Sequence, residues 1–143
     1  MNDRPELALL SDADGVHVGQ EELGVTEARR ILGPQAIVGV STHSIEQLRQ
    51  AILDGASYVG CGPTFPSTTK TFSEFAGLEY LKAAAAETSL PAFAIGGIQL
   101  SNVQQAVAAG FRRVAISGAI RDPQRSPREV IAAFRELLSA EGG

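Results

Sequence analysis

The chain of 143 residues has a single cysteine, Cys61, and no excess of basic residues. A lone cysteine cannot form an intrachain disulfide and fits a reducing compartment, so the expected location is the cytoplasm. The formal net charge of −4 argues against a surface for nucleic acid or an anionic membrane and favours small polar molecules as partners. No charged start is followed by a long apolar stretch, so we expect neither a secretory signal nor a membrane span.

The sequence also lacks a nucleophile arrangement in which its histidines could take part. His17 alternates with Val16 and Val18 in an expected strand, so it is predicted to be a packed, hydrogen-bonded core histidine rather than a catalyst. His43 follows another strand and could touch a ligand. Cys61 is predicted to be a small core residue, because no basic neighbour in the sequence would lower the pKa of its thiol. Nucleophilic catalysis is therefore not expected.

Short apolar runs alternate with helical patterns along the whole chain. Strands are expected at residues 15–19, 36–40, 58–62, 92–95 and 113–117, and helices at residues 6–11, 26–32, 45–53, 75–88, 102–109 and 127–139. Capping signals at residues 44–47, 101–104 and 126–129 mark the starts of three helices. Strict alternation of strands and helices predicts a parallel sheet.

A parallel sheet can be an open, doubly wound sheet or a closed barrel. The chain has no dinucleotide fingerprint and its units are of near-equal size, which favours the barrel. Eight such units need roughly 200 residues, and Met1 to Arg4 reads as the tail of a strand. We therefore expect an α/β fold, a (β/α)8 TIM barrel that is N-terminally incomplete, with about five strand-helix units in one domain over residues 1–143.

Such an incomplete barrel would leave two strand edges open, at Val16 and at Val114. Uncovered edges invite pairing with another chain or aggregation, so a homo-oligomer formed through these edges is one expectation.

A loop at residues 62–70 follows the third expected strand and is crowded with hydroxyl groups around one lysine. The side chains of Ser67, Thr68 and Thr69 and the ammonium group of Lys70 can donate to phosphate oxygens. A polar surface loop without a ligand is the alternative reading.

Two glycine turns point the same way, at residues 94–98 and 116–120. In barrels of this kind the active-site residues follow the carboxyl ends of the strands, and phosphate is often bound after the last two strands. Glycine there lets backbone N–H groups approach a phosphate closely. Together with the lysine loop, these turns favour a phosphorylated ligand.

Carboxylates stand at two other expected strand ends. Asp3 follows one, and Glu21 and Glu22 follow the next. Oxygen ligands from separate loops suit magnesium, which takes one or two carboxylates and completes its shell with phosphate and water. Solvated surface acids remain the alternative, and only the neighbouring phosphate loops make a Mg²⁺ site competitive with it.

Together these motifs resemble the thiamine phosphate synthase family over essentially the whole chain. The resemblance is carried, in the family's order and spacing, by residues 2–4, 13–22, 39–44, 62–70 and 94–98. It implies a phosphate-binding barrel and a transferase of thiamine biosynthesis. Such an enzyme couples hydroxymethylpyrimidine diphosphate with thiazole phosphate and gives thiamine phosphate and pyrophosphate.

The resemblance also implies roles for individual residues. The pair that holds the diphosphate and magnesium would be Asn2 and Asp3, and Glu22 would be the second metal ligand, where the family normally has aspartate. Ser41 would contact the pyrimidine and Lys70 the diphosphate, so these two are the residues expected to act in catalysis.

The resemblance implies a second set of residues, which would bind the thiazole phosphate. Ser67 and Thr69 match a pair of threonines in the family, with serine in place of the first. Further phosphate contacts would be Gly97, Ser117 and Gly118. At residues 117–120 this chain reads Ser-Gly-Ala-Ile, where the family more usually has Val-Ser-Ala-Ile. Backbone donors tolerate that change.

One family motif is missing. The Gln-x-Arg-x-Lys strand that also grips the diphosphate would lie before Met1, so the sequence indicates a fragment of a longer synthase or a shortened product with weak or no activity. Two other readings stay open: a thiazole tautomerase, which shares the barrel, and an inactive half barrel that binds phosphate. Residues 19–22 and 69–70 favour the synthase over the tautomerase.

Overall fold

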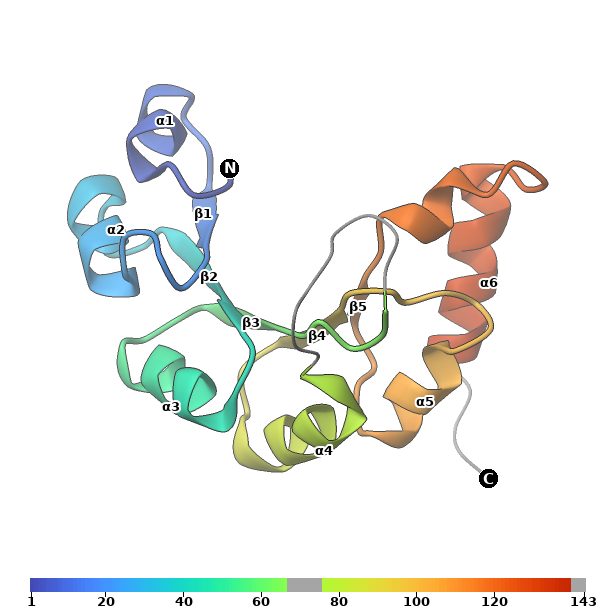
Figure 1. Cartoon of the computed structure of the whole chain (residues 1–143). Helices are drawn as coiled ribbons and strands as arrows, with labels where there is room; N and C mark the ends of the chain where they lie inside the picture. The colour runs from blue at the N-terminus through green and yellow to red at the C-terminus, as the bar shows by residue number, and fades with distance from the viewer. Residues whose placement is uncertain (67–75, 140–143) are drawn as a thin grey trace.

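The computed structural model describes residues 1–66 and 76–139, and in these residues a five-stranded sheet is lined by helices (Figure 1). The strands are β1 (Gly15–Val18), β2 (Ile37–Thr42), β3 (Tyr58–Cys61), β4 (Ala92–Ile95) and β5 (Val114–Ala115). The helices are α1 (Pro5–Leu10), α2 (Val25–Leu32), α3 (Ile45–Leu53), α4 (Gly77–Glu87), α5 (Val103–Ala108) and α6 (Pro127–Ser139), with a short 3-10 helix, η1 (Gly118–Arg121), between β5 and α6.

Every pair of neighbouring strands in the sheet is parallel, and the strand order β1-β2-β3-β4-β5 follows the order along the chain. The predicted parallel α/β fold is therefore confirmed. A doubly wound sheet reverses its strand order at a switch point, and this sheet has no reversal among the described strands. The helices lie along one side of the sheet, which curves from β1 to β5 (Figure 1).

The core lies between this side of the sheet and the helices. Alternate strand residues point into it and are buried: Val16, Val18, Val38, Val40, Val59, Cys61 and Ala94. Burial raises the pKa of the Cys61 thiol, as a core cysteine requires. On the opposite, inner face, Ile37 and Ile95 remain 50% and 41% exposed. The described helices thus cover one face only. None of them is long and apolar enough to cross a membrane.

Two of the three predicted helix caps are confirmed. The Ser44 hydroxyl accepts a hydrogen bond from the backbone N–H of Gln47, and Ser126 and Glu129 form a reciprocal capping box. The third prediction, a cap at residue 101, is wrong. Helix α5 begins at Val103, because the side chain of Asn102 bonds to the turn after β4. The 3-10 helix η1 was not predicted.

Arg29 of α2 joins the loops that precede β2 and β3. Its guanidinium donates to the carbonyl oxygens of Pro34, Ala36 and Gly55, at 2.9, 2.6 and 2.9 Å, and to the Ser57 hydroxyl at 3.1 Å. The planar guanidinium satisfies four acceptors at once, which a lysine ammonium cannot do in the same geometry.

Replacing Arg29 with lysine should therefore lower the free energy of unfolding by about 1–3 kcal/mol, although the charge is kept. Urea denaturation followed by circular dichroism measures this. Arg30→Lys is the matched control, because Arg30 is exposed and makes no hydrogen bond among the described residues. Equal stability of the two variants would contradict the role assigned to Arg29.

Candidate functional site

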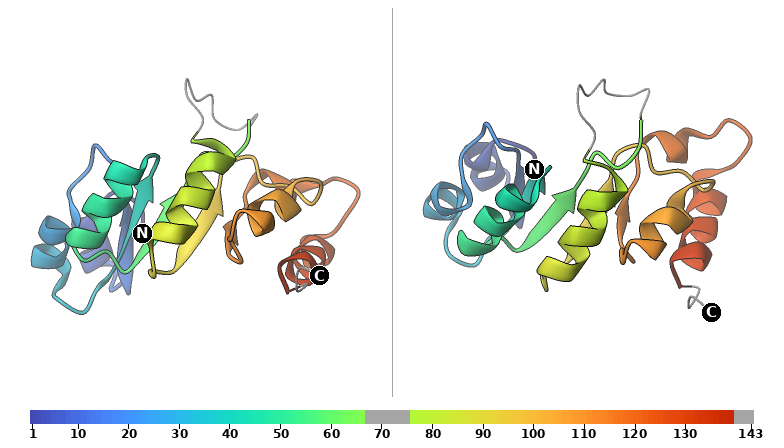
Figure 2. Two further views of the ribbon diagram at one scale, coloured as in Figure 1. Left: turned by 90° about the horizontal axis from the view of Figure 1, so that it is seen from below. Right: turned by 60° about the horizontal axis from the view of Figure 1, so that its bottom comes forward.

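The carboxyl ends of the five parallel strands lie along one edge of the sheet. We call this the C-terminal edge; it is formed by the strand-end residues Val18, Thr42, Cys61, Ile95 and Ala115. In Figure 2 the segment after β3 and the turn after β4 lie side by side at this edge. Side chains that follow different strands are thus brought together there.

The segment after β3 is bonded directly to the end of β4. Both the backbone N–H and the hydroxyl of Thr64 donate to the carbonyl oxygen of Ile95, at 2.9 Å each, and the N–H of Phe65 donates to Gly96 O at 3.0 Å. Thr64 is almost fully buried. The described part of the predicted lysine loop, residues 62–66, is therefore held against the first glycine turn, whereas Ser67, Thr69 and Lys70 lie outside the described residues.

Gly97 occupies the tightest point of the turn after β4. Its φ of +63° is in the left-handed region, and a Cβ there would lie 2.5 Å from Phe65 O and 2.6 Å from Pro66 O. Its own carbonyl accepts a hydrogen bond from the Asn102 side chain at 2.9 Å. Only glycine allows the segments after β3 and β4 to approach this closely.

Ser117 and Gly118 follow β5 at the same edge. Both are exposed, and Ser117 is the N-cap of η1, whose first residue is Gly118. The Ser117 carbonyl accepts from the N–H of Ile120 at 3.3 Å, which closes the short helix. The predicted phosphate contacts Gly97, Ser117 and Gly118 therefore follow the ends of two adjacent strands, β4 and β5.

Residues 1–3 lie beside β1, as predicted for the tail of a strand. Asn2 forms a parallel bridge with His17, the His17 N–H donates to Met1 O at 2.9 Å, and the Asp3 N–H donates to His17 O at 2.8 Å. Asp3 has a left-handed φ of +62° and is exposed. Asn2 and Asp3 are thus placed at the C-terminal edge of β1.

Glu22 lies at the same strand end. Its carboxylate occupies the space that a Cβ of Gly19, the first residue after β1, would need. Asp3 and Glu22 are therefore two exposed carboxylates near the end of β1. The described residues contain no group of three or more His, Cys, Asp or Glu that could hold a metal. Two carboxylates still fit magnesium, which takes its other ligands from phosphate and water.

Ser41 of β2 is one end of a hydrogen-bonded chain across three strands. The His17 ring on β1 lies with Nε2 2.9 Å from Ser41 Oγ and with Nδ1 3.0 Å from the Tyr58 hydroxyl on β3. The side chain of Gln20 donates to the Ser41 carbonyl at 2.5 Å. The prediction that His17 is hydrogen-bonded is confirmed, but the prediction that it is a core residue is wrong: Val16 and Val18 point into the core, and His17 between them is half-buried on the inner face. Its link to Ser41 was not predicted.

Tyr58 was also missed as a residue of the site. Strand alternation could have found it, since Tyr58 is two residues from Gly60 and so lies opposite the buried Val59 and Cys61. Its ring crosses β2 over Gly39, where a methyl group would overlap it. The open inner face forms a hollow of about 670 Å³, lined in part by His17, Tyr58 and Gly60.

The pKa of His17 is lowered, chiefly by burial, although the nearby charge of Asp3 opposes this. Below the ordinary histidine pKa of about 6.5, the unfolded chain therefore binds a proton more readily than the folded chain. The free energy of unfolding therefore keeps its full value above this pH and falls as the pH is lowered below it. Thermal melting should show a shallower fall for His17→Gln than for the parent. Equal slopes for His17→Gln and the parent would contradict this assignment.

His43 lies on the rim, as predicted, and is exposed. Its Nδ1 is hydrogen-bonded to the carbonyl of Gly62, and its backbone N–H donates to the side chain of Gln47 at 2.7 Å. His43 thus ties the end of β2 to the start of the segment after β3. Its contact with a ligand stays a prediction.

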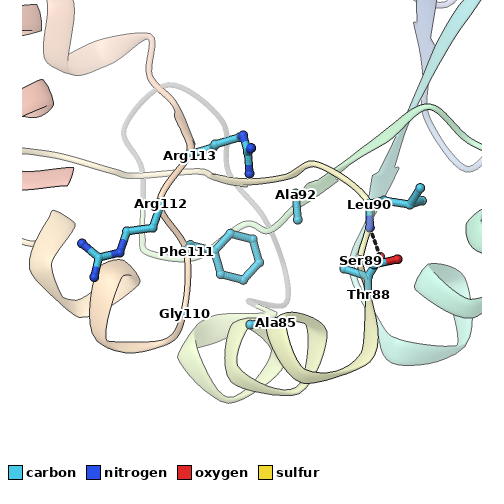
Figure 3. Close-up of a pocket in the computed structure, with 9 residues that line it drawn as sticks. All are labelled: Ala85, Thr88, Ser89, Leu90, Ala92, Gly110, Phe111, Arg112 and Arg113. Atoms are coloured by element: carbon cyan, nitrogen blue, oxygen red, sulfur yellow. Dashed lines mark hydrogen bonds between the residues drawn. The ribbon is translucent and has the colours of Figure 1, made fainter. Parts of the chain in front are cut away.

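A second hollow lies at the other edge of the sheet, where β4 and β5 begin (Figure 3). Phe111, Arg112 and Arg113 line it opposite Thr88 and Leu90, and Thr88 Oγ1 accepts from the Leu90 N–H at 3.0 Å. None of the predicted site residues that the structure describes, Asn2, Asp3, Glu22, Ser41, Gly97, Ser117 or Gly118, lines this hollow. The candidate site is therefore the C-terminal edge.

Comparison with known proteins shows to which family the chain belongs. Residues 1–120 match the thiamine monophosphate synthase family. The chain belongs to this family. A thiamine-phosphate synthase of Rhodopirellula baltica is 48% identical over an alignment of 143 positions, which covers 96% of this chain and 38% of that protein. One of Gloeobacter violaceus is 44% identical over 97% of this chain and 40% of its own length.

A solved member of the family has the same fold. The thiamine phosphate pyrophosphorylase of Pyrococcus furiosus superposes with a TM-score of 0.80 at 32% identity, over 96% of this chain and 67% of that one. The chain thus spans about two fifths of the length of the curated synthases it matches.

Proposed function

We propose that this chain forms the thiazole phosphate side and the metal side of a thiamine phosphate synthase. The reaction joins hydroxymethylpyrimidine diphosphate to thiazole phosphate and releases pyrophosphate. One observation carries the proposal: the segment after β3, hydrogen-bonded to the glycine turn after β4, lies at the same edge as the turn after β5 and the carboxylates beside β1. Family membership supports it.

The two carboxylates, Asp3 and Glu22, would hold Mg²⁺, and Asn2 would bind the diphosphate beside them. The ion, when bound, would neutralise the negative charge that develops on the leaving diphosphate. Lys70 would add a second positive charge there, which stabilises the transition state more than the ground state. Ser41 would hold the pyrimidine ring in place.

The thiazole phosphate would be held by hydroxyl groups of Ser67 and Thr69 and by the turns at Gly97, Ser117 and Gly118. Their backbone N–H groups suit a phosphate, since glycine allows close approach. Anchoring the phosphate would place the thiazole nitrogen in line with the pyrimidine methylene carbon. The pyrimidine ring can stabilise the cation left when the diphosphate departs, so the protein need not supply a general base.

We further propose that the sheet represents five consecutive units of a (β/α)8 barrel within one domain over residues 1–143. Three observations support this: the sequential parallel order, the helices on one side, and the exposed Ile37 and Ile95 on the inner face. Strands β1 and β5 are the outer strands of the sheet, and among residues 1–66 and 76–139 the outer side of β1 is paired only through the bridge at Asn2. Pairing between copies through these edges, and a cytoplasmic location, stay predictions.

The function is tested with the purified chain, both substrates and Mg²⁺. We expect release of pyrophosphate and formation of thiamine phosphate, with loss of both on chelation of the metal. Lys70→Ala should abolish product formation. Lys82→Ala should not, because Lys82 is exposed on α4 and paired with Glu79. Conversion of a thiazole carboxylate phosphate without coupling would favour the tautomerase. A melting temperature raised by thiazole phosphate, without turnover, would favour an inactive phosphate-binding half barrel.

A further inference from the structure

We propose that His17 is a positioning residue that orients the Ser41 hydroxyl toward the pyrimidine substrate. Tyr58 sets which nitrogen of the His17 imidazole carries the proton. This inference rests on the proposed function, because it names the task of His17 in that same site. His17 and Tyr58, which both lie on the inner face, have no other role in the proposed site.

The three side chains lie on one face of three neighbouring strands. His17 pairs in register with Gly39 of β2, and Ser41 is two residues further along β2, on the same face. Tyr58 pairs in register with Gly39 from the other side. Because Gly39 has no side chain, the Tyr58 ring can cross β2 and reach the imidazole, and the two ring centroids are 5.5 Å apart.

The hydrogen bonds define the direction in which the Ser41 proton points. A neutral imidazole has one donor and one acceptor nitrogen. The two ring nitrogens lie 3.0 Å from the Tyr58 hydroxyl and 2.9 Å from Ser41 Oγ. A phenol is a stronger donor and a weaker acceptor than an aliphatic hydroxyl, so we assign the tautomer in which Tyr58 donates to Nδ1 and Nε2–H donates to Ser41 Oγ. The Ser41 O–H is then free to donate to an acceptor on the ligand, such as a nitrogen of the pyrimidine ring.

The backbone around the same residues is equally constrained. The N–H and carbonyl of His17 bond to Met1 and Asp3, so the ring is anchored at the strand end that carries the predicted metal ligand. The Ser41 carbonyl accepts from the Gln20 side chain. His17 is only half-buried and lines the open hollow together with Asn2 and Tyr58, so its neighbourhood is accessible to a ligand.

The decisive experiment compares three His17 variants. His17→Leu removes both hydrogen bonds, His17→Asn places an amide near Nδ1 only, and His17→Gln can place an amide N–H near the position of Nε2. We expect His17→Leu and His17→Asn to raise the KM and the Kd for the pyrimidine diphosphate about tenfold. The kcat should change less, the KM for thiazole phosphate should be unchanged, and His17→Gln should recover most of the loss.

Two variants outside the pyrimidine contact test the role of Tyr58. Tyr58→Phe keeps the ring but removes the donor, and Gly39→Ala displaces the ring. Both should alter the ring-nitrogen chemical shifts of His17 in ¹⁵N NMR and raise the pyrimidine KM about threefold. Gly60→Ala should leave the His17 spectrum unchanged, because its methyl group would meet Cε1 of His17 at an ordinary 3.6 Å.

The inference is overturned if the parent chain makes thiamine phosphate and His17→Leu leaves the pyrimidine KM unchanged. It is also overturned if the variants raise both KM values equally and His17→Gln gives no recovery, since that marks a general packing role. A parent chain that binds neither substrate instead contradicts the proposed function. In that case unchanged ring-nitrogen shifts in Tyr58→Phe would overturn the positioning of His17 as well.

Discussion

Replacing Gly97 with alanine is expected to abolish binding of thiazole phosphate and to lower the free energy of unfolding by at least about 2 kcal/mol. The new methyl group would have to occupy a left-handed backbone position and would lie 2.5–2.6 Å from the carbonyl oxygens of Phe65 and Pro66. Those atoms belong to the backbone, so they cannot move away as a flexible side chain could. The turn after β4 and the segment after β3 must separate instead.

The matched control is Gly55→Ala. Gly55 also has a left-handed φ, +77°, but nothing lies within 4 Å of a Cβ placed there. This variant should cost only the strain of the left-handed conformation, about 1 kcal/mol, and should bind thiazole phosphate as the parent does. Denaturation and isothermal titration calorimetry measure the two effects. If Gly97→Ala binds the ligand normally, the close approach of the two segments is not what shapes the phosphate site.

Replacing Asp3 with asparagine should lower kcat/KM about a hundredfold or more and raise the Mg²⁺ concentration required, because a metal ligand worth several kcal/mol is lost. Asparagine tolerates the left-handed conformation of Asp3, φ +62°, as well as aspartate does, so the fold should be retained. Calorimetric titration of Mg²⁺ in the presence of inorganic pyrophosphate provides a readout that does not depend on turnover.

Asp12→Asn is the control for that experiment. Asp12 is also exposed and has a left-handed φ of +53°, but it lies between α1 and β1, at the opposite edge of the sheet. This variant removes the same charge and should leave both Mg²⁺ binding and activity unchanged. A similar loss in the two variants would show that net charge, rather than a carboxylate at the end of β1, is responsible.

The secondary structure was predictable where periodicity and end signals agree. The predicted ranges of β4, α3 and α6 match the structure residue for residue, because Ser44 and Ser126 cap the two helices through local hydrogen bonds. The capping pattern predicted the wrong start for helix α5, which follows the turn after β4. There the amide of Asn102 bonds to Gly97 and Gln99, so the helix starts later than the cap at residue 101 predicted.

The candidate site was predictable in its location but not in its internal contacts. Motif spacing after each strand was enough to predict that Asp3, Gly97 and Ser117 lie at one edge, because all carboxyl ends of a parallel sheet meet there. The link from His17 to Tyr58 could not be predicted. It joins residues 41 positions apart and depends on Gly39 lying between them in register.

The sequence by itself determined the family, the parallel strand-helix order and the edge at which the predicted phosphate-binding residues follow the strands, since these come from motifs and from periodicity along the chain. The tertiary structure alone decided how the strands align. Register places Tyr58 across Gly39 and His17 beside Ser41, and it brings Thr64 onto Ile95. Such contacts depend on interstrand pairing, which joins residues far apart in sequence and leaves no periodic signal in the chain.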